Sequence, residues 1–177
     1  MLSSNLLLAA VASSAAAQLS DLLSTPFLNL TALSAAKGES VFECWQLASP
    51  FKETAVPGIA GSLKLSLGEL GSASYDVIPA RFDGGFHHAP AFQYVLFISG
   101  LAHISLYAGD EEVWVHGGKY GLLIAADTAD RTVHGHRTRY PSASDTVALE
   151  IHIRDRDSFK YKVLHSGACH ESETTGI

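Results

Sequence analysis

The amino-acid sequence predicts an all-β fold, and three observations support this prediction. Short apolar runs follow one another from residue 41 onward, as in QYVLFISG (93–100) and LAHISLYA (101–108). Turn signals rich in Gly, Asp and Pro separate these runs every 8–12 residues or so, roughly the spacing of all-β domains. Segments such as TVALEIHI (146–153) alternate apolar and polar residues, which is the period of a half-buried strand. Roughly eight to ten successive strands with little helix predict a sandwich, a jelly roll or a barrel.

The first residues are typical of a secretory signal peptide. The apolar stretch from Leu6 to Ala12 is too short to span a bilayer, and Ala15-Ala16-Ala17 forms a small-residue cleavage site that ends the leader at residue 17. The alternative interpretation is an alanine-rich helix at the start of the domain. No later segment predicts a transmembrane helix. The chain is therefore predicted to be secreted and extracellular, without a membrane partner.

The remaining chain predicts one domain with a flanking segment and a tail. Of its 177 residues 47% are hydrophobic and 17% charged, which is typical of a globular chain large enough to bury a core. Little β-branching over residues 18–40 predicts a short helical segment on the outside of the domain. Residues 41–170 are expected to form the β domain and residues 171–177 a flexible tail. The net charge of -6 and the lack of a basic run argue against a nucleic-acid partner.

Two sequence features agree with export. Asn29-Leu30-Thr31 is an acceptor triplet for N-glycosylation. The two cysteines of the chain are Cys44 and Cys169, and an even count in a secreted protein permits one disulfide between the terminal segments. Two buried free thiols are the alternative. A zinc site is disfavoured because neither cysteine has a second one nearby.

Four of the nine histidines form two clusters, His87-His88 and His134-Gly135-His136. Neutral imidazole is the commonest metal ligand. Adjacent strand residues point to opposite faces, so only one of the first pair can face the interior, whereas His134 and His136 can share a face. With a side-chain oxygen, such histidines would suit Mn, Fe, Zn, Ni or Cu. The alternative is a polar rim without a site. Loop carboxylates that flank the clusters are Asp83, Asp127 and Asp130.

Residues 84–100, GGFHHAPAFQYVLFISG, resemble the first motif of the cupin superfamily (RmlC-like proteins), in which histidines precede an acidic ligand and a glycine closes the strand. Gln93 stands at the acidic position and Gly100 at the closing glycine. Residues from Gly118 onward resemble the second motif, with His134 or His136 as its histidine. The resemblance extends to small secreted fungal proteins of the cupin type. It implies a double-stranded β-helix (jelly-roll) barrel with a metal site whose candidate ligands are His87, His88, Gln93, His134 and His136.

Three departures from the cupin pattern affect this site. Gln93 offers a carbonyl oxygen without charge, so it binds a divalent metal more weakly than a carboxylate does and cannot act as a general base. The histidines of the first motif are adjacent rather than two apart, which leaves both His87 and His88 open as the ligand. The glycine and proline expected before the histidine of the second motif are absent from ADTADRTV.

Two functions follow from the resemblance. The first is a metal-dependent enzyme that oxygenates, decarboxylates or isomerises a small organic molecule with one divalent transition metal ion. The second is a non-catalytic protein that binds a small ligand or an extracellular partner without metal. Cupins often pair through edge strands, so the resemblance also implies a homodimer. Serine hydrolase, kinase and dinucleotide-binding functions are excluded because the chain lacks their motifs.

Overall fold

A computed structural model describes residues 26–174, and these residues form the predicted all-β fold, with thirteen strands and no helix. Accordingly, no helix in this part of the chain could cross a membrane. The chain divides into two compact units, which are considered separately. The described part of the smaller unit contains the hairpin of β3 (Lys52–Glu53) and β4 (Leu63–Lys64).

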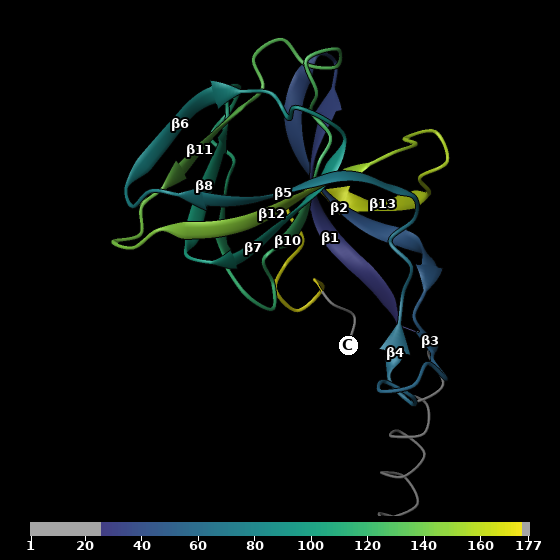
Figure 1. Ribbon diagram of the computed structural model, residues 1–177. Coiled ribbons are helices and arrows are strands. Elements are labelled where there is room, and N and C mark those ends of the chain that lie inside the picture. The colour runs from purple at the N-terminus through teal and green to yellow at the C-terminus, as the bar shows by residue number, and fades with distance from the viewer. Residues whose placement is uncertain (1–25, 175–177) are drawn as a thin grey trace, which may run out of the picture. The chain divides into compact units, whose positions relative to one another are not determined.

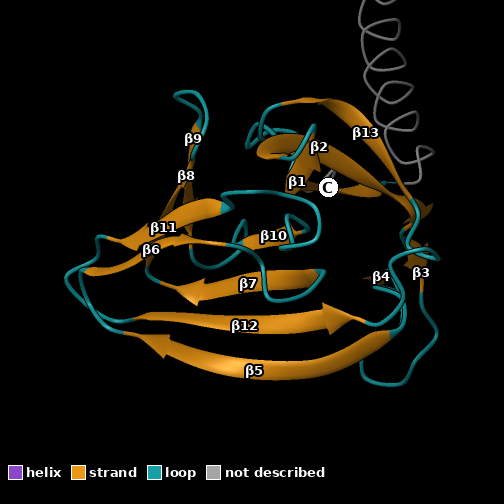
Figure 2. Cartoon of the chain, turned by 90° about the horizontal axis from the view of Figure 1, so that it is seen from above, coloured by secondary structure: helices purple, strands orange, loops and turns teal. Residues whose placement is uncertain are grey.

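The larger unit, which comprises Phe27–Ser49 and Ser66–Ile177, is built from two sheets. The seven-stranded sheet has the order β13 (Tyr161–Ser166), β2 (Glu39–Pro50), β1 (Phe27–Ala36), β10 (Leu122–Ala125), β7 (Gln93–Ser99), β12 (Thr146–Ile153), β5 (Leu70–Ile78). The four-stranded sheet has the order β6 (Phe82–His87), β11 (His136–Tyr140), β8 (Leu101–Leu106), β9 (Glu112–His116). Figure 2 shows β10, β7, β12 and β5 side by side. Within the described residues, hydrogen bonds do not close the two sheets into one continuous barrel.

From β5 to β12 the chain passes back and forth between the sheets. Strands β5, β7, β10 and β12 belong to the larger sheet, and β6, β8, β9 and β11 belong to the smaller one (Figure 1). Apolar side chains from both sheets meet between them and form the core, which includes Val95, Phe97, Ile104, Leu106 and Leu123. The space between the sheets is therefore where side chains distant in sequence come together.

The helical segment predicted over residues 18–40 is wrong in its described part. Phe27–Ala36 is strand β1, which pairs in parallel with β10 and buries Leu30, Ala32 and Leu33. Residues 18–25 lie outside the described residues, as does the signal peptide predicted over residues 1–17. Strand propensity depends on the packing that a segment finds, so pairing with β10 outweighs the weak local preference of this sequence.

The predicted disulfide is confirmed. Cys44 on β2 is bonded to Cys169, which lies beyond β13 and 125 positions further along the chain. The two cysteines therefore join an early strand of the larger unit to its C-terminal segment.

Strands β6 and β11 approach each other closely where Gly135 precedes β11. Gly135 has a φ of +68°, and a Cβ added to it would lie 2.1 Å from the carbonyl oxygen of His87. His136, the next residue, stands directly opposite His87 in the strand register. Because no side chain separates the strands here, the two imidazole rings lie with their centroids 4.4 Å apart.

Replacing both Cys44 and Cys169 with Ser is expected to lower the free energy of unfolding by about 4–5 kcal/mol, because the long loop regains its entropy in the unfolded chain. Urea unfolding of the variant and the wild type measures this difference. Wild type treated with a reductant should show the same shift. Equal unfolding midpoints in all three samples would contradict the structural role of the bond.

Replacing Gly135 with Ala is expected to destabilise the protein more than replacing Gly85, which also has a positive φ but has open space around its Cβ position. The left-handed backbone alone costs about 1 kcal/mol in Gly85→Ala, and the clash with His87 should at least double that cost in Gly135→Ala. Urea unfolding of the two variants compares them. Similar losses of stability in the two variants would contradict a tight contact between β6 and the backbone at Gly135.

Candidate metal centre

A pocket of about 50 Å³ lies between the sheets at one end of the core. Its polar side chains come from strands β6, β7, β11 and β12, and apolar core residues line the rest of it. Its polar lining consists of His87, Gln93, His136, Thr138, Tyr140 and Glu150. Three of the five residues that the sequence predicted as metal ligands, His87, Gln93 and His136, are thus brought together.

His136 is held by a buried carboxylate. Its Nδ1 lies 2.7 Å from Oδ2 of Asp127, a side chain with no exposed surface. The same Oδ2 also accepts a hydrogen bond of 2.7 Å from the hydroxyl of Ser40. An ionised carboxylate can only accept, so Nδ1 of His136 carries a proton, and in the neutral ring Nε2 keeps a free lone pair. Oδ1 of Asp127 has no protein partner among the described residues.

His87 is oriented in the same sense by a different group. Its Nδ1 lies 3.0 Å from the carbonyl oxygen of Gly85, which can only accept, so this nitrogen is the donor and Nε2 is again free. Burial of the ring, followed by repulsion from His136 whenever that ring is protonated, lowers the pKa of His87 below its ordinary value. The ring is therefore neutral near pH 7, which is the state that binds metal.

Gln93 and Glu150 supply the oxygen atoms of the pocket. Gln93 is 1% exposed, and its Nε2 donates a hydrogen bond of 2.9 Å to Oε2 of Glu150. Its Oε1 is buried and has no partner among the described residues. Burial, followed by the negative charges of Glu150 and Asp76, raises the pKa of Tyr140 to about 12. The hydroxyl of Tyr140 is therefore a donor rather than a base at physiological pH.

Glu150 was not singled out by the sequence analysis, although a signal for it exists. In TVALEIHI the residues Val147, Leu149 and Ile151 share one face, which places Glu150 on the other face with Ala148. The structure turns that second face toward the core, where Ala148 is buried and Glu150 reaches the pocket.

The other two predicted ligands lie outside this pocket. Nε2 of His88 lies 3.0 Å from the carbonyl oxygen of Thr132. The ring of His134 stacks on Tyr107 with centroids 3.7 Å apart, and its Nδ1 lies 3.4 Å from Oε2 of Glu39. Metal binding by His88 or His134 stays a prediction that the pocket geometry does not support.

The possible metal-binding atoms of His87, His136 and Glu150 do not lie close enough together to surround one common point. Within residues 26–174, one group of three His, Cys, Asp or Glu side chains has its donor atoms within 4.8 Å of one another, and it comprises Cys44, His165 and Glu173. Cys44 is held in the disulfide, so its sulfur is not the thiolate that binds metal. In the pocket, a metal held by both imidazoles would draw the amide oxygen of Gln93 or the carboxylate of Glu150 toward them.

Asn29, the predicted glycosylation site, lies on β1 with its side chain in two hydrogen bonds. Its Nδ2 donates to the carbonyl oxygen of Glu173 at 2.8 Å, and its Oδ1 accepts from Nε2 of Gln46 at 3.1 Å. Glycosylation of Asn29 stays a prediction.

No family model and no curated protein sequence matches the chain significantly. Among solved structures, the chain is similar to the capsular polysaccharide assembling protein CapF from Staphylococcus aureus, with a TM-score of 0.37, 15% sequence identity and 80% of this chain covered. A structure of CapF with the inhibitor 3-isopropenyl-tropolone gives a TM-score of 0.36 and 15% identity over 81% of this chain. The chain spans 35% and 36% of the length of these two structures. So distant a likeness says nothing of what this chain binds.

Proposed function

We propose that the chain is a secreted protein of the cupin type that binds one divalent transition metal ion in the pocket and acts on a small organic molecule. The strand order supports the cupin assignment, because β5-β12-β7-β10 and β6-β11-β8-β9 together have the order of an eight-stranded jelly roll. The residues that resemble cupin ligands, His87, Gln93 and His136, line one pocket. The disulfide is compatible with an oxidising extracellular environment.

The observation that carries the proposal is the orientation of the two imidazoles. His87 and His136 each use Nδ1 for a hydrogen bond to the protein and keep Nε2 free. Metal-binding histidines commonly donate the second ring nitrogen to a carbonyl or carboxylate in this manner, which fixes the tautomer and the ring orientation. The unpartnered Oε1 of Gln93 offers a third donor, and Glu150 offers the negative charge that Gln93 lacks. Such nitrogen and oxygen donors suit Mn, Fe, Zn, Ni or Cu.

When bound, the metal would act as a Lewis acid that polarises an oxygen atom of the substrate. Glu150 is the pocket group able to accept a proton, and Tyr140 is able to donate a hydrogen bond. A volume of about 50 Å³ admits only a few atoms, so a substrate would place one end in the pocket and leave the rest outside. These residues fit oxygenation, decarboxylation or isomerisation of a small molecule.

A non-catalytic protein that binds a small ligand without metal is the second candidate. The hydrogen bond from Gln93 to Glu150 favours it, because this bond engages the two oxygen-bearing side chains with each other. In that function, the free Nε2 atoms would accept hydrogen bonds from a neutral ligand.

Protein purified without a histidine tag and reconstituted with each candidate metal is expected to hold close to one equivalent, measured by inductively coupled plasma mass spectrometry. His136→Ala should lose this metal, because it removes one of the two free Nε2 atoms. His134→Ala is the matched control and should keep it, because His134 stacks on Tyr107 away from the pocket. Only traces of metal in the reconstituted wild type would favour the non-catalytic function.

Asp127→Asn is expected to weaken metal binding by about 10–100-fold, the usual effect of losing a carboxylate that orients a metal-binding histidine. Asp130→Asn, which changes an exposed carboxylate three residues away, is the control and should bind as the wild type does. Competition with a chromophoric chelator measures both affinities. Equal affinities in the two variants would show that Asp127 does not orient a metal ligand.

A further inference from the structure

A second cavity, of about 300 Å³, lies among β9, β10 and the C-terminal segment of residues 169–174. We call it the β9 groove. Its apolar lining consists of Val113, Val115, Leu122 and Leu123, and its aromatic lining of Trp114 and Tyr120. Polar groups come from Thr31, His116, Glu171 and Thr174. An apolar surface with a few polar groups and this volume is typical of small-ligand sites.

Trp114 is exposed but fixed in place. The residue is 51% exposed, yet its indole stacks on the ring of His103 with centroids 4.1 Å apart and an interplanar angle of 13°. Its Nε1 donates to Oε1 of Glu112 at 3.4 Å, and Oε2 of Glu112 lies 2.8 Å from Nε2 of His103. One carboxylate thus holds both rings. A ring that is already ordered costs a ligand less conformational entropy on binding.

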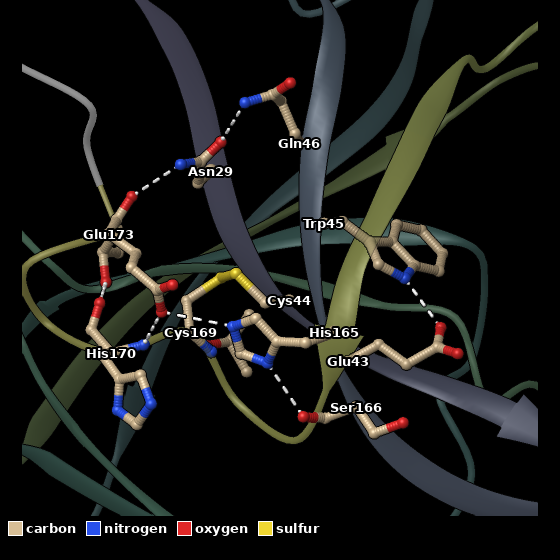
Figure 3. Close-up of a disulfide and its surroundings, with 12 residues drawn as sticks. Asn29, Glu43, Cys44, Trp45, Gln46, His165, Ser166, Cys169, His170 and Glu173 are labelled. Carbon is tan, nitrogen blue, oxygen red and sulfur yellow. Dashed lines mark hydrogen bonds and ion pairs between the residues drawn. A yellow bond between two sulfur atoms is a disulfide. The ribbon is translucent and has the colours of Figure 1, made fainter.

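The C-terminal wall of the groove is tied to the sheet in several ways (Figure 3). The disulfide bonds Cys169 to Cys44 on β2, and the backbone N–H of Cys169 donates to the hydroxyl of Thr31 on β1 at 3.1 Å. The carboxylate of Glu173 lies 3.2 Å from Nε2 of His165 and accepts a hydrogen bond of 2.8 Å from the backbone N–H of His170. These bonds hold the C-terminal segment beside the strands.

The charges around the groove favour an uncharged ligand. Glu171 would repel an anion. The ammonium group of Lys119 lies over the ring of Tyr120, 5.1 Å from its centroid, so that ring already holds a cation, and the ammonium would repel a second one. The apolar and aromatic walls suit a flat ring, and the threonine hydroxyls, His116 and Glu171 can bond to hydroxyl groups on it.

We propose that the β9 groove is a second binding site, separate from the pocket between the sheets, for a small uncharged ring compound of the phenol class.

The test uses three probes of similar shape and different charge: neutral 4-hydroxybenzyl alcohol, anionic 4-hydroxybenzoate and cationic tyramine. The chain has two tryptophans, Trp45 and Trp114, so a ¹H–¹⁵N spectrum should contain two indole signals, which Trp114→Phe assigns. We expect the neutral probe to shift the signal of Trp114 saturably, with an affinity about tenfold or more above that of either charged probe.

Two variants separate this site from the pocket. Trp114→Ala, a change at the surface, should weaken binding of 4-hydroxybenzyl alcohol by about tenfold or more in calorimetry, whereas His136→Ala should leave it unchanged. The inference is overturned if no probe shifts the Trp114 signal or if the three probes bind equally. It is also overturned if the sugar maltose, which has hydroxyl groups but no aromatic ring, shifts the signal and 4-hydroxybenzyl alcohol does not. Loss of binding in His136→Ala would also overturn it, because the ligand would then occupy the pocket.

Discussion

The buried carboxylate of Asp127 joins the parts of the chain on which the pocket depends. It lies beyond the end of β10 and accepts hydrogen bonds from Ser40 at the start of β2 and from His136 at the start of β11. Burying a charged group is costly unless hydrogen bonds compensate it, so these two donors determine where the three segments can lie. The same bond decides which nitrogen of His136 faces the pocket. The hydrogen bond between His136 and Asp127 therefore both positions β11 and orients a proposed metal ligand.

The second requirement for the pocket is the close approach of β6 and β11. His87 and His136 belong to two separate histidine clusters in the sequence. They meet because Gly135 has no side chain, so its backbone can lie directly against that of His87. The jelly-roll strand order then places Gln93 on β7 and Glu150 on β12 in the facing sheet. The smaller sheet contributes four of the six polar side chains of the pocket, and the larger sheet contributes Gln93 and Glu150. The apolar core behind these residues confines the pocket to a few atoms.

The sequence predicted the features that depend on local pattern or on counting. Alternation in TVALEIHI located β12, and two cysteines allowed one pairing. Strand β1 could not be predicted, because its strand conformation comes from pairing with β10, far along the chain. Strand alternation showed that one of His87 and His88 faces inward, but only the second sheet decides which one. Glu150 was missed for the same reason. The β9 groove was beyond prediction because it combines β9 with a C-terminal segment.

The central claim is that His87 and His136 both present an unprotonated Nε2 to the pocket. Long-range ¹H–¹⁵N correlation spectra of the metal-free, ¹⁵N-labelled protein distinguish the two neutral tautomers of each histidine, and His87→Ala and His136→Ala assign the signals. We expect the Nδ1–H tautomer for both residues at neutral pH, because Gly85 and Asp127 accept from that nitrogen. An Nε2–H tautomer at either residue would contradict the proposed site.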